Sequence, residues 1–139
     1  MAIKLVNPLR SRIVDVVSAY LSGTNGTSGS GAMLRVYGGT QPGTGGGTAG
    51  TQEILVQIDG IAWSSGSNGT AVLAAQVTGT AGTAGAATWA RLSGTDGTGY
   101  VIDGVCGTSA ASDFVIDSAS IVATAVVTLT AASIIQPAS

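Results

Sequence analysis

The stretch TWARLSGTDGTGYVIDG, residues 88–104, predicts the fold more clearly than any other part of this chain of 139 residues. Its two arms alternate in character, and Asp96-Gly97 between them is a strong signal for a tight turn. Because neighbouring side chains of a strand point to opposite faces, Trp89 and Arg91 should share one face. The stretch therefore predicts an antiparallel hairpin.

Short apolar runs separated by Gly, Thr, Ser and Asn continue this pattern over most of the chain. Strands at such intervals, bounded by turn residues, are typical of β-sandwiches and β-barrels. The run at 120–130 is expected to divide near 123–125. We expect strands at residues 32–37, 52–61, 71–78, 86–92, 99–105, 113–117, 120–130 and 133–136.

The N-terminal part follows a helical period instead. Asn is a favoured N-cap and Pro suits the first helical position, so Asn7-Pro8 predicts a helix start. Apolar residues then recur at helical spacing, and Gly23 can end the helix. A strand over 12–20 is the alternative, because the run is rich in β-branched residues, but its alternation is broken. We expect a single domain over 1–139, with an N-terminal arm and helix over 1–23, a linker over 24–31 and a β-sandwich over 32–139.

Charged residues make up only 9 % of the chain, which has no histidine and a formal net charge of −2. Acid–base and nucleophilic catalysis mostly use His, Lys, Cys and paired carboxylates, so we expect no enzyme and no cofactor. Five basic residues, three of them near the N-terminus, are too few for a phosphate-binding face, and we expect no nucleic-acid partner. So little charge also favours self-association.

Among the seven carboxylates, only Asp103 with Asp113 or Asp117 is dense enough for a catalytic pair. A glycosidase needs two facing carboxylates, one with a raised pKa. Asp59, Asp96 and Asp103 each precede a glycine, so turns and strand ends explain these residues better. The regular ligand spacing of a calcium loop is missing. We therefore expect neither catalytic nor metal-binding residues.

The segment GGTQPGTGGGTAG, residues 38–50, is long for a connection between strands and has no apolar anchor of its own. Loops of this length are usually functional or disordered. It lacks the lysine of a phosphate-binding loop and does not join a strand to a helix. We expect it to be free to reach a neighbouring molecule; a mobile surface loop without a partner is the alternative.

The remaining distinctive side chains have structural interpretations. A single cysteine forms no internal disulfide, and Cys106 ends an apolar run, so we expect a buried, inert thiol. Trp63 and Trp89 are expected in the core, with an anchoring role in a protein interface as the alternative. No apolar run reaches the roughly 18 residues of a membrane span, so we expect no membrane partner and synthesis in the cytoplasm.

Several motifs together resemble small structural proteins of tailed phages that are found with the head genes. Their pattern is an Arg-x-Tyr strand followed by Gly and Pro, a Trp-x-Arg strand, an Asp-Gly turn, an Ile-Asp-Gly strand end and a Ser/Ala-Asp-apolar strand. The resemblance covers most of the chain, and its motifs are structural. The matching residues are Arg35, Tyr37, Gly39, Pro42, Trp89, Arg91, Asp96, Gly97, Ile102, Asp103, Gly104 and Asp113.

The resemblance implies a capsid decoration, or cement, protein. The fold expected is mainly β, an antiparallel β-sandwich of jelly-roll type with one N-terminal helix. Such a protein binds the outside of a phage head and bridges neighbouring copies of the major capsid protein, so that separating them must also break its contacts. The resemblance implies a homodimer whose partner is the major capsid protein and whose place is the exterior of the virion.

The contacts with the capsid are expected from residues 1–12, which carry most of the positive charge, from the loop 38–50 and from an exposed sheet edge. The alternative function is a head or tail fibre domain, an adhesin that binds a bacterial surface glycan. Such a domain would share the strands rich in Gly and Thr and the lack of catalytic groups. The partner-binding residues that we expect are Lys4, Arg10, Arg12, Gln41 and Pro42.

Overall fold

The structure is a computed structural model that describes residues 4–21, 31–94 and 102–137. These ranges contain one helix and ten strands, so the expected mainly β fold with an N-terminal helix is confirmed. The elements are α1 (Asn7–Leu21), β1 (Ala32–Tyr37), β2 (Ile54–Ile61), β3 (Thr70–Val72), β4 (Val77–Thr80), β5 (Gly85–Ala86), β6 (Trp89–Ser93), β7 (Ile102–Gly107), β8 (Phe114–Ile116), β9 (Ser120–Ile121) and β10 (Val126–Ile135).

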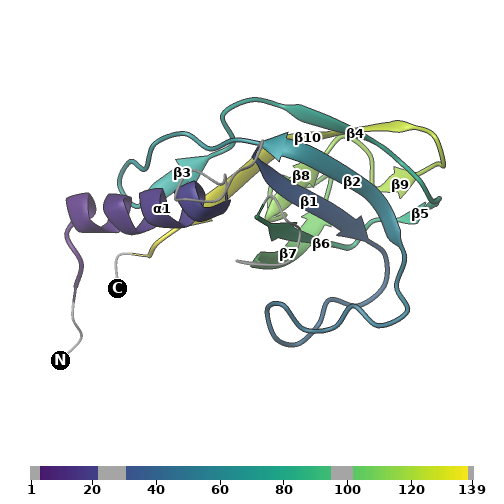
Figure 1. Ribbon diagram of the computed structural model, residues 1–139, viewed down its shortest axis with the longest axis horizontal. Helices are drawn as coiled ribbons and strands as arrows, with labels where there is room; N and C mark the ends of the chain where they lie inside the picture. The colour runs from purple at the N-terminus through teal and green to yellow at the C-terminus, as the bar shows by residue number, and fades with distance from the viewer. Residues whose placement is uncertain (1–3, 22–30, 95–101, 138–139) are drawn as a thin grey trace.

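Eight strands form one curled sheet in the order β2-β1-β6-β7-β8-β10-β3, with β4 also paired to β10 (Figure 1). The curl brings the two ends of this sheet together: Val56 forms a bridge with Ala81, and Gly82 N donates to Leu55 O at 3.0 Å. The sheet is therefore a half-barrel. Its concave side holds the core, in which Leu34, Ile58 and Leu129 are fully buried.

The predicted hairpin is confirmed in its two arms. Strands β6 and β7 pair antiparallel with Trp89 opposite Val105 and Arg91 opposite Asp103. The turn residues Asp96-Gly97 lie outside the described residues, as does most of the expected linker at 24–31.

Strand β8 runs parallel to β7, so the expectation of a purely antiparallel sheet is wrong. Cys106 pairs with Phe114 and Gly107 with Val115. Parallel neighbours usually need a crossover of about a dozen residues or more, whereas here residues 108–113 connect them. A short loop suffices because only the end of β7 pairs with the start of β8. Two stacked sheets of jelly-roll type are not confirmed, because the main sheet is single and curled.

Two predicted strand divisions are also wrong. The expected strand at 71–78 is interrupted: β3 pairs with residues 133–135 and β4 with residues 126–129 of the same strand, β10. A register irregularity in β10 between Leu129 and Ala131 separates these two pairings. The separate strand expected at 133–136 is the last part of β10, whereas the division near 123–125 is confirmed between β9 and β10.

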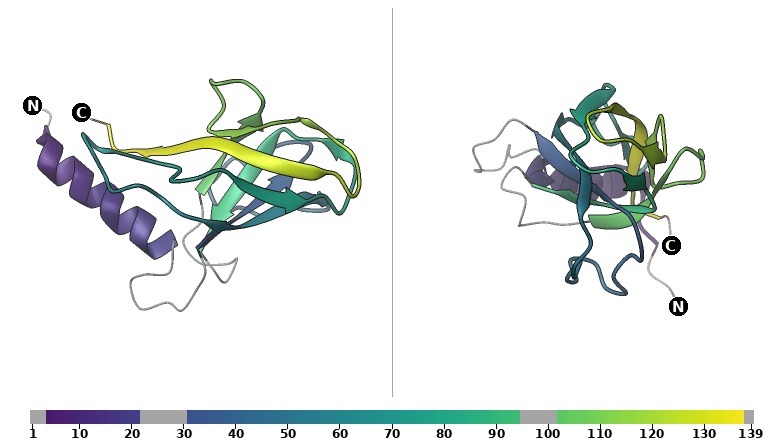
Figure 2. Two further views of the ribbon diagram at one scale, coloured as in Figure 1. Left: turned by 90° about the horizontal axis from the view of Figure 1, so that it is seen from above. Right: turned by 90° about the vertical axis from the view of Figure 1, so that its right-hand side faces the viewer.

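Helix α1 is confirmed, but it begins one position differently. Arg10 N donates to Val6 O at 3.1 Å, so Val6 is the capping position and Asn7 already belongs to the helix. Figure 2 shows α1 at one end of the molecule, beside the end of β10 and β3. Val14 and Leu21 are buried against the sheet. In the described part of the chain, no helix is long and apolar enough to cross a membrane.

Candidate interaction surfaces

The loop 38–50 is fastened to the sheet by a buried ion pair. Arg91 Nε donates to Asp103 Oδ1 at 2.7 Å and Arg91 Nη2 to Asp103 Oδ2 at 2.8 Å, and the two residues lie opposite each other in β6 and β7. From the loop, Gly46 N donates to Asp103 Oδ2 at 2.9 Å, and Gly47 O accepts from Arg91 Nη2 at 2.6 Å. The Asp103 side chain is only 1 % exposed. The pair therefore joins the loop to two strands.

These contacts change the protonation behaviour of both partners. Burial disfavours the charged form of Asp103, but the hydrogen bonds from Arg91 and Gly46 outweigh it, and the pKa of Asp103 lies below its ordinary value. The hydrogen bond to Asp103 raises the pKa of Arg91. Both groups are charged at neutral pH, so the loop is held by charge-assisted hydrogen bonds.

A second set of contacts between the loop and the sheet lies beside this ion pair, on the same face of the sheet. The rings of Tyr37 and Trp89 are stacked, with centroids 4.4 Å apart, and Arg91 lies 5.6 Å from the Trp89 ring centroid. Trp89 Nε1 donates to Gln52 Oε1 at 2.8 Å, and Gln52 Nε2 donates to Thr40 O at 2.8 Å. Trp89 is 1 % exposed, which confirms its place in the core.

The loop was expected to lack an apolar anchor of its own, and the contacts that hold it are polar and come from the sheet. Thr88 Oγ1 also donates to Gly39 O at 2.7 Å. At the tip, residues 43–45 are exposed, and the anchoring to the sheet begins at Gly46. The loop is thus a shaped projection with a free tip. We call residues 38–50, with this anchoring, the anchored loop.

A second surface is the outward face of α1. Leu9 and Val16 are 48 % and 52 % exposed, and Tyr20 is also exposed. With Ile13 they follow the spacing of one helix face, opposite the buried Val14 and Leu21. An open hollow of about 360 Å³ on this face is lined by Leu9, Arg12, Ile13, Val16 and Val17. We call this face the α1 stripe.

The expected partner-binding residues fall into two separate groups. Lys4 is exposed before α1, and Arg12 is exposed beside the α1 stripe with Asp15 Oδ2 at 3.8 Å from its Nη1. Arg10 instead holds the helix, because its Nε and Nη2 donate to Gln136 O at 2.9 and 2.7 Å. Gln41 and Pro42 lie half-buried in the anchored loop. Figure 1 shows that this loop, which connects β1 and β2, lies away from α1.

The carboxylates considered for catalysis each have a structural partner. Asp113 Oδ2 accepts from Val105 N at 2.8 Å, and Asp117 Oδ1 accepts from Thr128 N at 3.0 Å. Asp103 has a lowered pKa, opposite to what a general acid needs. The expected burial of Cys106 is confirmed, and burial raises the pKa of its thiol to about 12.

The anchoring roles of Tyr37, Gln52 and Gly47 were missed by the sequence reasoning. The predicted hairpin places Arg91 and Asp103 on its two arms, but a two-residue turn at Asp96-Gly97 would set Arg91 opposite Ile102, so the pairing of Arg91 with Asp103 differs from that register by one residue. The α1 stripe had a signal in the sequence, since the predicted helix carries apolar residues around more of its circumference than one buried face needs. No family model, curated protein or solved structure matches the chain.

Proposed function

We propose that this chain is a structural protein of a phage virion that binds the outside of the head and bridges neighbouring major capsid proteins. The observation that carries the proposal is the presence of two separate exposed surfaces, the α1 stripe on the helix and the anchored loop that is held to the sheet. A bridging protein needs two such surfaces, because each holds one neighbour and the scaffold transmits the load.

The chemistry of the two surfaces supports the proposal that each of them binds one neighbouring protein. Exposed apolar side chains on a helix face favour a protein partner, since burying them removes apolar surface from water. The tip of the anchored loop offers backbone groups already held in shape by Arg91, Asp103 and Gln52, so little conformational entropy is lost on binding. The jelly-roll arrangement implied by the resemblance remains part of the proposal.

The fibre or adhesin alternative has less support. A glycan-binding platform needs several exposed rings, but Trp89 is buried, Tyr37 stacks on it, and Tyr20 is the one exposed ring among the described residues. Quantifying the protein on purified particles separates the two functions, because a cement protein occurs at a high and a fibre at a low copy number.

The test is occupancy on purified phage heads that lack the protein. A variant with L9S and V16S should bind at least about tenfold more weakly, since two half-exposed apolar contacts of roughly 1 kcal/mol each are lost. A variant without residues 43–45, which keeps Gly46 and its contact with Asp103, should also lose occupancy. The matched control carries V122S and V126S. The native Val122 and Val126 side chains are 65 % and 63 % exposed but lie near the start of β10, outside both proposed surfaces, so this variant should bind normally. Undiminished occupancy of both test variants would exclude the proposal.

A further inference from the structure

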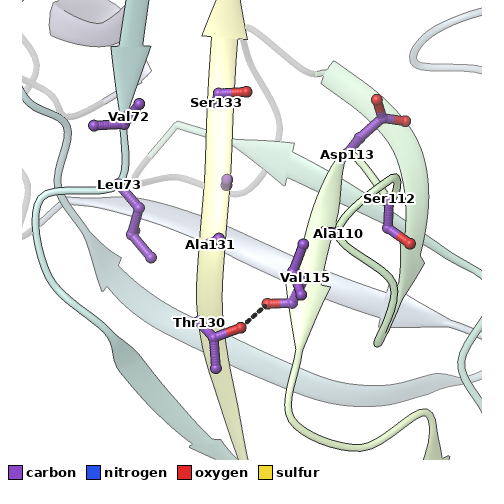
Figure 3. A pocket seen from close by; sticks show the side chains of 10 residues that line it. Val72, Leu73, Ala110, Ser112, Asp113, Val115, Thr130, Ala131 and Ser133 are labelled. Carbon is purple, nitrogen blue, oxygen red and sulfur yellow. Dashed lines mark hydrogen bonds between the residues drawn. The ribbon is translucent and has the colours of Figure 1, made fainter.

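The turn that leads into β3 is a two-residue hairpin turn made of Asn68 and Gly69. Ser67 N donates to Thr70 O, and Thr70 N donates to Ser67 O, both at 2.9 Å. Both central residues have a positive φ, 51° for Asn68 and 79° for Gly69. This is a turn of type I′, for which Asn-Gly is a preferred sequence because both residues tolerate the left-handed conformation. Strand β3, seen with Val72 in Figure 3, then pairs with the end of β10.

This turn is also where α1 and the end of β10 are joined. Gly69 N donates to Ser11 Oγ of α1 at 3.2 Å, and Gly69 O accepts from Gln136 N at 2.7 Å. Arg10 of α1 donates to Gln136 O through Nε and Nη2. A Cβ atom at Gly69 would lie 2.8 Å from both Arg10 Nη2 and Gln136 O, so the position requires glycine. The docking of α1 therefore depends on the shape of this turn.

An Asn-Gly step can be modified without an enzyme. Gly69 N attacks Asn68 Cγ, so that an N–Cγ bond forms, the Cγ–Nδ2 bond breaks, and Nδ2 leaves as ammonia with the proton of Gly69 N. Water then opens the cyclic imide at one of its two carbonyl carbons. Opening at Cγ leaves aspartate, whereas opening at the backbone carbonyl carbon leaves isoaspartate, in which the chain runs through Cβ and Cγ. Glycine favours the attack, since no side chain shields its nitrogen.

The folded turn withholds this nitrogen from the reaction. The imide ring requires Asn68 Cβ and Gly69 N on the same side of the Cα–C bond of Asn68, whereas the left-handed conformation places them on opposite sides. The N–H of Gly69 is also held by Ser11. The side chain of Asn68 is exposed, so water reaches it. The reaction therefore needs the turn to open, and its rate measures how often Gly69 leaves α1.

We propose that Asn68 is a modification site at which the chain slowly forms isoaspartate, and that the docking of α1 on the turn sets the rate. Isoaspartate lengthens the backbone before Gly69 by one carbon atom. A turn with this extra atom cannot keep Gly69 between Ser11 and Gln136, so the product is a chain in which α1 is held less firmly. The inference concerns the isolated protein and does not rest on the proposed function.

The first test measures the conversion of Asn68 by peptide mapping and mass spectrometry, with isoaspartate quantified by an isoaspartyl methyltransferase. Mapping is needed because Asn25-Gly26 is a second Asn-Gly step in the sequence. The folded chain and the chain in guanidinium chloride are kept at the same mildly alkaline pH. Conversion should be at least about tenfold slower in the folded chain, because the turn is closed most of the time. Equal rates, or no conversion in the folded chain over weeks, would overturn the inference.

The second test asks whether α1 controls the rate. S11A removes the partner of Gly69 N and should speed conversion about fivefold, the effect of one lost hydrogen bond on the population of the open turn. S109A is the matched control, because Ala111 N donates to Ser109 Oγ at the same 3.2 Å in the connection between β7 and β8. It should convert at the native rate. An unchanged rate in S11A would contradict control by α1.

The third test examines the product in a chain with N25Q, in which Asn68 precedes the one remaining Asn-Gly bond. Trypsin should cleave after Arg10 faster in the purified isoaspartate form than in the unmodified chain, since Arg10 is half-buried and held by Gln136 O while α1 is docked. N68D carries the same added charge without the longer backbone and should be cleaved at the unmodified rate. Equal cleavage of the isoaspartate form and N68D would overturn the inferred effect on α1.

Discussion

At the scale of single residues, Asp103 joins the largest number of separate parts. Its carboxylate receives hydrogen bonds from Arg91 on β6 and from Gly46 in the anchored loop. It also relieves a conflict in the sheet, because Arg35 and Arg91 are direct neighbours in the register of β1 and β6. Like charges placed opposite one another destabilise a sheet unless a counter-charge is present. The carboxylate supplies that counter-charge.

The stability that Asp103 contributes to the fold should depend on pH. Because the pKa of Asp103 is lower in the folded state than its unfolded value of about 3.9, its contribution to stability is present above that value and is lost as pH falls through the folded pKa. D103N should cost about 3 kcal/mol at pH 7, since it removes the charge partner of a largely buried Arg91. Urea unfolding of both proteins between pH 7 and pH 2 measures this difference, which should shrink below about pH 4.

The matched control is D59N, because Asp59 lies in an exposed part of β2 and accepts from Gln57 Nε2 at 3.2 Å. This variant should change the free energy of unfolding by less than about 0.5 kcal/mol at every pH. A pH-independent difference between the native chain and D103N would show that the charge of Asp103 contributes no stability.

Some of this cluster could be predicted from the sequence and some could not. The hairpin predicts that Arg91 and Asp103 lie on neighbouring strands, because residues 88–104 are local in the chain, but it does not determine the register that places them opposite each other. The contacts of Gly46 and Gly47 depend on a loop 44 to 57 residues away, and glycine has no side chain to signal them. Long-range polar contacts of this kind leave no periodic pattern in a sequence.

At the scale of elements, the close approach of β4 to β2 determines how far the sheet curls. A Cβ atom at Gly79 would collide with Gln57 O and would lie 2.9 Å from Ile58 Cγ1. Glycine therefore lets the two ends of the sheet meet. Neighbouring elements are less constrained, since a Cβ at Gly82 would meet nothing within 4 Å.

G79A should consequently destabilise the protein by about 1–3 kcal/mol, the usual cost of forcing an extra methyl group into a closely packed contact. G82A is the matched control, and it should change the free energy of unfolding by less than about 1 kcal/mol. Thermal unfolding followed by circular dichroism measures both. Equal stability of the two variants would mean that the approach of β4 to β2 does not require glycine.

The elements themselves were predicted unequally well. The bounds of β1 and the division before β10 follow from local patterns, and both are confirmed. The split between β3 and β4 does not, because these strands pair with two separate parts of β10, residues 133–135 and 126–129, and this pairing is not a local pattern. The parallel pairing of β7 with β8 was missed for a similar reason: the residues 108–113 resemble any short turn, and the return path depends on tertiary contacts.

At the scale of the whole molecule, Cys106 reports on the integrity of the fold. Its thiol is buried, and burial raises its pKa to about 12. A disulfide reagent at pH 8 should react at least about 100-fold more slowly with the folded than with the urea-unfolded chain, because only the thiolate attacks and it must be reached.

The control for this measurement moves the thiol by one position. A chain with C106A and V105C carries it where the native valine is 52 % exposed, and it should react rapidly while folded. Fast reaction of the native chain at low reagent concentration would show that β7 opens frequently.

Strand β10 has a consequence for how the chain acquires its shape during synthesis. It supplies partners for β8, β4 and β3, and its last residues are followed by the carbonyl that receives Arg10 from α1. Until residues 126–136 have left the ribosome, three earlier strands have unsatisfied edges. The nascent chain must therefore remain protected from its neighbours until β10 has been made, and closure through such distant contacts is expected to be slow, on the order of milliseconds to seconds.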